Sequence, residues 1–171
     1  AASPVATGRA ARWLADVKTL ATVHEADLRV TVLLDVSVLS GAPGVFSVRL
    51  PPGLDLVGTS GVTLDSSQRQ GERLELRVTD PARRRHQFLV SLERAVGSEW
   101  RGVEVPLVAV EGAQRETGEV AVEAVGTLEL TAREEGTLKR IDLREASQAL
   151  RTLAQQAVLA AFRYRHRPSE P

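Results

Sequence analysis

The 171-residue sequence contains no cysteine and no methionine, and its six aromatic residues are two Trp, one Tyr and three Phe. The absence of cysteine excludes disulfides, thiol catalysis and thiolate metal sites. The histidines His24, His86 and His166 are far apart and form neither an HxH nor an HExxH motif. We therefore expect no metal site and no cofactor. The absence of methionine predicts that Ala1 is a processed end or the boundary of a fragment.

The chain also lacks an excess of charge of either sign. Its formal net charge is zero, although 26% of its residues are charged. A chain without an overall field is a poor ligand for DNA or for an anionic membrane surface, so we expect no nucleic-acid partner. No apolar run approaches the roughly 20 residues that span a bilayer, so we expect no membrane insertion by these residues. Twenty arginines against two lysines indicate a bacterium with a GC-rich genome.

What the chain does contain is alternation of apolar and polar residues. Between Ala26 and Ser37, leucine or valine occupies every second position from Leu28 to Val36. This is the two-residue period of a strand with one buried face, and it recurs along most of the chain. The pattern predicts an all-β fold, an antiparallel β-sandwich of about nine to eleven strands, with a closed barrel as the alternative.

Turn signals divide this pattern into expected strands. Gly, Pro and short polar clusters separate the apolar periods, and adjacent periods with short polar turns are typical of hairpins. The polar stretch Ser66–Gly71 has no apolar period and predicts a loop. Pro106 lies inside an apolar run and predicts an edge position or a bulge there. The expected strands span residues 12–24, 28–39, 46–50, 54–57, 62–64, 74–78, 88–92, 103–110, 118–125, 127–133 and 158–164.

One segment near the C-terminus has a helical period instead. Apolar residues recur at intervals of three and four from Leu143 to Ala154, and Asp142 with Glu145 has the spacing of a capping box. We expect a single short amphipathic helix here. The predicted organisation is a flexible segment at 1–11, one sandwich domain at 12–166 and a linker-like tail at 167–171.

Clustered cations are the first candidate binding residues. Arg83, Arg84 and Arg85, followed by His86, form the densest positive run and predict either a docking patch for phosphate or an acidic partner, or a solvated hairpin tip. A second cluster at 163–167 is expected on the solvent side of the last strand.

Paired carboxylates are the candidate catalytic residues. Glycosidases need two carboxylates about 5 to 10 Å apart, which Glu119 with Glu123 or Glu72 with Glu75 could supply. Because Glu119 and Glu123 alternate with valines, we expect both to face water. The sequence therefore predicts no catalytic residue and no enzyme.

Trp100 is the candidate for carbohydrate binding. It lies between Glu99 and Arg101 in an expected loop, whereas Trp13 is in register with apolar neighbours and is expected in the core. An exposed aromatic ring on a sandwich is typical of a glycan-binding surface.

Together these patterns favour a non-catalytic module. We expect a structural or protein-interaction domain of a larger bacterial protein, binding a protein partner or adjoining domains of its own polypeptide. Its architecture is similar to that of modules in bacterial surface and periplasmic proteins, which predicts an extracytoplasmic location. One alternative is a carbohydrate-binding or accessory domain of a carbohydrate-active enzyme. Another is an edge-pairing domain in which the strand Leu28–Leu39 offers an unpaired edge.

Overall fold

The computed structural model of the chain describes residues 10–95, 105–126 and 138–166. In these residues the chain forms eleven strands, one 3-10 helix and one short α-helix. In chain order these are β1 (Arg12–Val23), β2 (Asp27–Ser40), β3 (Val45–Arg49), β4 (Asp55–Ser60), β5 (Leu64–Gln70), β6 (Arg73–Val78), β7 (Arg85–Ala95), β8 (Ala109–Val110), β9 (Arg115–Ala124), β10 (Lys139–Ile141), η1 (Leu143–Glu145), α1 (Gln148–Leu153) and β11 (Val158–His166).

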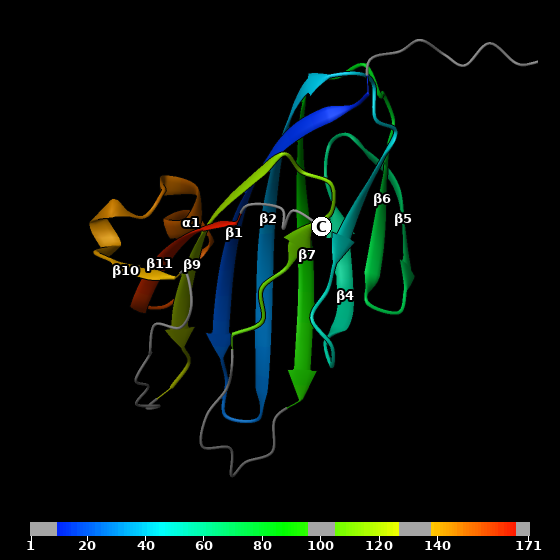
Figure 1. Cartoon of the computed structure of the whole chain (residues 1–171). Coiled ribbons are helices and arrows are strands. Elements are labelled where there is room, and N and C mark those ends of the chain that lie inside the picture. The colour runs from blue at the N-terminus through cyan, green and yellow to red at the C-terminus, as the bar shows by residue number, and fades with distance from the viewer. Residues whose placement is uncertain (1–9, 96–104, 127–137, 167–171) are drawn as a thin grey trace, which may run out of the picture.

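The strands form two sheets that pack face to face (Figure 1). The larger sheet has seven strands in the order β10-β11-β9-β1-β2-β7-β4, and the smaller has four in the order β5-β6-β3-β8. Both sheets are open, so the fold is a sandwich and not a closed barrel. The predicted all-β sandwich is confirmed.

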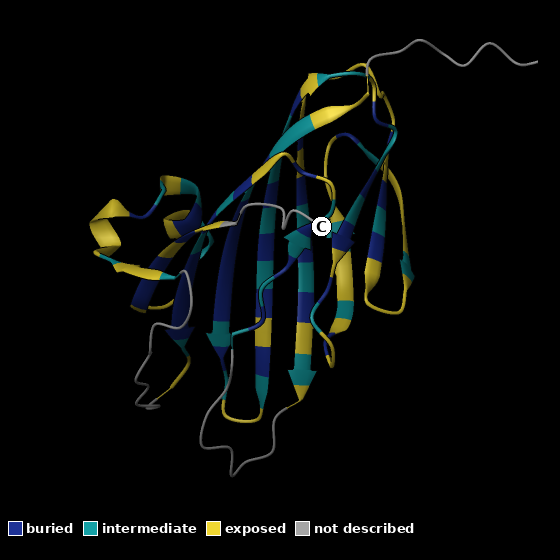
Figure 2. Ribbon diagram, in the orientation of Figure 1, coloured by how far each residue is buried: buried dark blue, intermediate teal, exposed yellow. Residues whose placement is uncertain are grey.

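The core lies between the sheets and follows directly from the alternation in the sequence. Along β2, the residues at every second position from Leu28 to Val38 are buried, and the residues between them are not (Figure 2). Each fully buried valine or leucine contributes about 1.5–3 kcal/mol relative to an exposed one. Trp13 packs edge-on against Phe46 with ring centroids 5.5 Å apart, as expected for a core residue. The face of the seven-stranded sheet that points away from the smaller sheet is called the outer face below.

The long strands at the centre pair as the hairpin that the sequence predicts. β1 and β2 are antiparallel, with Val23 opposite Leu28 at the turn. On its other side, however, β1 pairs with β9 in parallel, with Leu14 opposite Arg115. One parallel pair therefore lies at the middle of an otherwise antiparallel sheet. β2 is paired on both sides, with β1 and β7, so the expectation that it offers an open edge is wrong.

The stretch predicted as a loop at Ser66–Gly71 is a strand. β5 forms the edge of the smaller sheet and pairs with β6, and Gly71 (φ +60°) forms the turn between them. No β5 residue is buried. A strand exposed on both faces needs no apolar period, so the alternation of residues cannot reveal it. Thr59 Oγ1 and Ser67 Oγ, 2.7 Å apart, link this edge to β4 of the larger sheet.

The hairpin predicted between β6 and β7 is also wrong. β6 belongs to the smaller sheet and β7 to the larger one, so residues 79–84 cross between the layers. Two antiparallel strands joined by a short polar segment have the same sequence signature whether they pair or lie in opposite sheets.

In the described part of the apolar run, residues 105–110, the two-residue strand β8 lies at the edge of the smaller sheet. Pro106 precedes β8, where its missing N–H breaks no ladder. Val103 and the strand predicted at 127–133 lie outside the described residues.

The single helix predicted at 143–154 is interrupted. Asp142 caps η1 by accepting a hydrogen bond from the Arg144 amide, and Ser147 caps α1 by accepting one from the Leu150 amide. Between them, Ala146 is extended and buried. The final strand β11 is confirmed, whereas the three-residue β10 is too short for its period to be recognised.

Candidate functional site

Part of the outer face is covered by the chain itself. Residues 142–157, called the cover segment, leave β10, form η1 and α1, and return as β11. Ala146 and Leu150 of this segment pack on Leu20 and Ala121, which point outward from β1 and β9. A small second core thus exists on the side of the sheet that the alternation assigns to solvent.

Two carboxylates of β9 hold the cover segment in place. Glu119 Oε2 accepts a hydrogen bond of 2.9 Å from the Ser147 amide. Glu123 Oε2 accepts bonds of 3.0 and 2.9 Å from the amides of Gln155 and Gln156, and its Oε1 accepts one of 2.8 Å from Thr22 Oγ1. The expectation that both face water is therefore wrong for Glu123, which is only 2% exposed. Alternation places both on the outer face but cannot show that the chain returns to cover it.

Lys18 lies opposite Glu119 on the neighbouring strand, and carboxylates close to its ammonium group balance the positive charge. Its Nζ is 2.5 Å from Asp16 Oδ2 and 3.6 Å from Asp35 Oδ2, and Glu119 also attracts it. Burial alone would lower the pKa of Lys18, but these carboxylates outweigh burial and raise the pKa above its ordinary value. The charges are thus paired within the sheet.

The arginine run occupies the connection into β7. Arg83, Arg84 and Arg85 are all exposed. Arg84 donates a hydrogen bond of 3.1 Å to the Gly41 carbonyl, so one of the three guanidinium groups braces a neighbouring turn. Because the connection crosses between the sheets, the run is not a hairpin tip. Its role as a docking patch stays a prediction.

His86 does not belong to this exposed run. It is 2% exposed, stacks on Phe88 with ring centroids 5.9 Å apart, and places Nδ1 2.9 Å from Thr63 Oγ1. Burial lowers the pKa of His86 below its ordinary value. Its position two residues before Phe88 in the inward register was the signal that could have placed it in the core.

The second arginine cluster lies on the same sheet but far from the first. Arg163 and Arg165 are exposed on β11, and Arg163 donates a hydrogen bond to the Glu145 carbonyl. Three strands separate β11 from β7, which at about 4.8 Å per strand places the clusters roughly 19 Å apart. They form no single patch. Trp100 lies outside the described residues.

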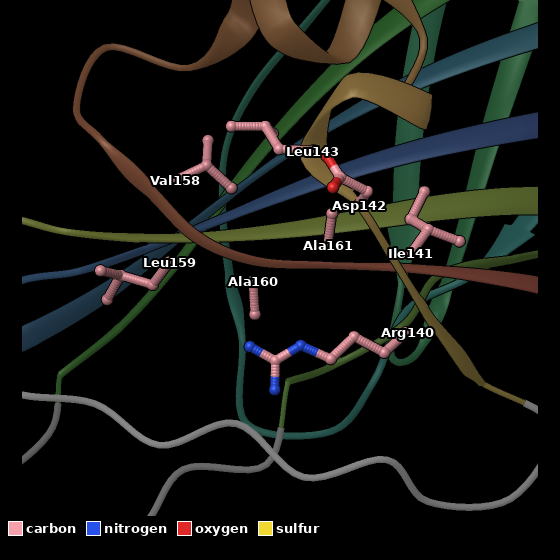
Figure 3. Close-up of a pocket in the computed structure, with 8 residues that line it drawn as sticks. All are labelled: Arg140, Ile141, Asp142, Leu143, Val158, Leu159, Ala160 and Ala161. Carbon is pink, nitrogen blue, oxygen red and sulfur yellow. The ribbon is translucent and has the colours of Figure 1, made fainter.

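A shallow depression lies where β10 leaves the edge of the sheet (Figure 3). Its volume is about 200 Å³, and its apolar lining comes from Ile141, Leu143, Val158, Leu159, Ala160 and Ala161. Arg140 and Asp142 complete the lining. In Figure 3, Val158 and Ala161 lie on one side of the β11 ribbon and Leu159 and Ala160 on the other. We call this feature the edge depression.

Two leucines of the edge depression are unusually exposed. Leu143 is 39% exposed and Leu159 is 42% exposed. The register between β11 and β9 shifts between Val158 and Ala160, so Leu159 is the extra residue of a bulge. Bulges near sheet edges redirect side chains, and this one turns a leucine toward solvent. The pattern of residues does not reveal this feature, because it depends on where β10 ends.

Within the described ranges, no group of three or more His, Cys, Asp or Glu side chains is arranged to hold a metal ion. Neither helix in those ranges is long and apolar enough to cross a membrane.

Comparisons with known proteins show likeness of fold without likeness of sequence. No protein-family model matches the chain, and no curated protein matches it. An M1 zinc metallopeptidase from Deinococcus radiodurans is similar in structure over 94% of this chain, with 12% identity and a TM-score of 0.53. This chain covers 40% of that one. A non-cellulosomal cohesin from Archaeoglobus fulgidus overlaps 67% of this chain and 92% of its own, with 13% identity and a TM-score of 0.36. The peptidase match shows that the chain shares a β-sandwich fold with part of a longer protein.

Proposed function

We propose that this chain is a non-catalytic β-sandwich module that serves a larger bacterial extracytoplasmic protein as a structural or protein-interaction domain. The observation that supports this proposal most strongly is the structural role of Glu119 and Glu123. Both bind backbone amides of the cover segment, and Glu123 is buried while doing so. A catalytic carboxylate must reach a substrate, whereas these two hold the fold together.

The size of the edge depression also favours protein contact over chemistry. Small-molecule sites usually occupy about 300–1,000 Å³ and enclose most of the ligand. The edge depression has about 200 Å³ and lies open at a sheet edge. It suits one or two side chains of a partner protein better than an enclosed substrate.

A role within a longer polypeptide is supported by the fold comparison. The M1 zinc metallopeptidase contains a region of this fold that makes up 40% of its chain. A second candidate is therefore an accessory sandwich beside a peptidase domain. The sequence on either side of residues 1–171 tests both: a signal peptide supports the location, and an adjoining peptidase domain favours the second candidate.

The absence of catalysis is tested directly on the purified chain. We expect no turnover above the buffer background with panels of glycoside, peptide and ester substrates. A hydrolase activity that disappears in a folded Glu119→Gln variant would overturn the proposal, because Glu119 would then act on a substrate.

The carbohydrate-binding alternative depends on Trp100 and has a separate test. A glycan array compares the chain with its Trp100→Ala variant. Under the leading proposal we expect no glycan to bind. Binding that is lost in the variant would favour the alternative.

A further inference from the structure

We propose that the open edge of β11 at Val158–Ala160 binds an extended acidic peptide of a partner protein, which adds to the seven-stranded sheet as a short strand. This inference rests on the proposed function and names the partner class. Three features of the same place support it: a strand edge with which no described strand pairs, an apolar depression and a cationic flank.

Among the described strands this edge is open, because β10 stops early. β10 pairs with β11 only through Ala161, Phe162 and Arg163. At Asp142 the chain turns into η1 and moves onto the outer face. Val158 and Ala160 pair with β9 on one side, and no described strand pairs with this part of β11 on the other. Backbone groups at such an edge can continue the hydrogen-bond ladder with another chain.

The edge depression lies beside this open edge and supplies a place for a side chain. Leu143 and Leu159 border it and are about two-fifths exposed. A bound partner that covers them would remove this apolar surface from water. In strand addition, main-chain bonds supply affinity and pockets for alternate side chains supply specificity. A volume of about 200 Å³ admits one or two apolar side chains of the added strand.

The charges beside the edge select an acidic partner. Lys139 is exposed on β10, and Arg163 and Arg165 are exposed on β11. Neither strand contains an acidic residue. Asp142 and Glu145 of the cover segment offset only part of this charge. A peptide with acidic residues flanking an apolar centre complements both the cations and the leucines.

Lysine and arginine on a three-residue edge strand also discourage uncontrolled pairing. They repel a second copy of this chain, whose own edge carries the same cations. A partner of opposite charge is therefore favoured over self-association.

The test uses the full chain and two blocked heptapeptides with alternating valine and leucine residues, one flanked by aspartates and one by lysines. Calorimetry measures affinity, and amide hydrogen exchange locates the contact. At low salt we expect the aspartate peptide to bind about tenfold tighter than the lysine peptide. We also expect it to slow exchange at Val158–Ala160.

Variants at exposed positions separate binding from folding. Leu159→Glu should abolish binding of the aspartate peptide, and Lys139→Glu should weaken it about tenfold. Leu39→Glu is the matched control, because Leu39 is 50% exposed on β2, away from the edge depression. It should bind as the unchanged chain does.

The remaining outcomes overturn the inference. These are no binding of either peptide, equal affinity for both, or protection at another edge such as β4. A dimer in light scattering that Leu159→Glu dissociates would identify a second copy as the occupant instead. The proposed function is tested by hydrolase activity, which these binding experiments do not measure. The inference can therefore fail while the proposed function stands.

Discussion

At the scale of single residues, Glu123 shows how a charged side chain can become structural without leaving its predicted face. Alternation with Val120 and Val122 puts it on the outer face, as the sequence indicates. There it meets three donors from Thr22, Gln155 and Gln156. A carboxylate that accepts several hydrogen bonds satisfies donors that burial would otherwise leave unpaired.

Glu123→Gln should therefore destabilise the chain although it preserves size and shape. The amide replaces an acceptor with a donor opposite backbone N–H groups, and we expect a loss of about 2 kcal/mol in the free energy of unfolding. Urea denaturation measures it. Glu93→Gln is the matched control, since Glu93 is exposed on the outer face of β7 and should change stability by less than about 0.5 kcal/mol. Equal losses in both variants would contradict this role.

His86 predicts a dependence of stability on pH. Because burial lowers its pKa in the folded state, the unfolded chain takes up the proton first when the pH falls below about 6.5. The stability contributed by neutral His86 is thus fully present above that pH and is lost as the pH falls toward the folded-state pKa. Asp80 opposes the shift, and Arg83 contributes in both directions.

Urea denaturation at a series of pH values between 5 and 8 tests this against His86→Gln. The difference in the free energy of unfolding between the two chains should be constant near pH 8. Near pH 5 the unchanged chain should lose stability relative to the variant. A difference that does not vary with pH would show that His86 does not titrate with folding.

At the scale of secondary structure, the long strands with one buried face were predictable, whereas β5 and β10 were not. β1, β2 and β7 each carry a long two-residue period because one side meets the core. β5 has no such side, and β10 is too short to show a period. The break between η1 and α1 depends on Ala146 packing against the sheet, which no local signal reveals.

The pairing of β9 with β11 depends on a glycine in the strand interior. A Cβ atom at Gly118 would overlap the Tyr164 ring, which packs directly over it. We expect Gly118→Ala to destabilise the chain by about 1–3 kcal/mol through overpacking. Thermal or urea unfolding measures the loss.

A double-mutant cycle identifies the cause. If the ring is the obstacle, Gly118→Ala should cost about 1 kcal/mol less in a Tyr164→Leu background than in the unchanged chain. Additive effects of the two substitutions would mean that the loss arises elsewhere.

At the scale of the whole molecule, the sandwich followed from the sequence, but the arrangement of its strands did not. Composition and period fix that sheets stack around an apolar core. They do not determine which strands share a sheet, so the sequence predicted a hairpin of β6 and β7 that the structure does not contain. The edge depression was equally hidden, because it arises from where β10 ends relative to β11.

The domain prediction is tested by truncation. A chain of residues 10–166 keeps every described strand, and also the Ala10 carbonyl that accepts a bond from Ser40 Oγ. Its stability should match that of residues 1–171 within about 0.5 kcal/mol. A chain of residues 1–113 lacks β9, β10 and β11 and should show no cooperative unfolding. A cooperative transition in the shorter chain would show that β1 needs no neighbour from the C-terminal part.

The parallel pair at the centre of the larger sheet also imposes a delay during biosynthesis, because β1 is made long before β9. Thr117 on β9 donates a hydrogen bond from Oγ1 to Asp16 Oδ1 on β1, and the two residues are 101 positions apart in the sequence. At about 5–20 residues per second, the first strand leaves the ribosome about 5–20 s before its partner exists. During that interval a long apolar strand has one flank without its native neighbour. Nascent chains of this protein should therefore depend on a holding chaperone more than a sandwich built only from successive hairpins would.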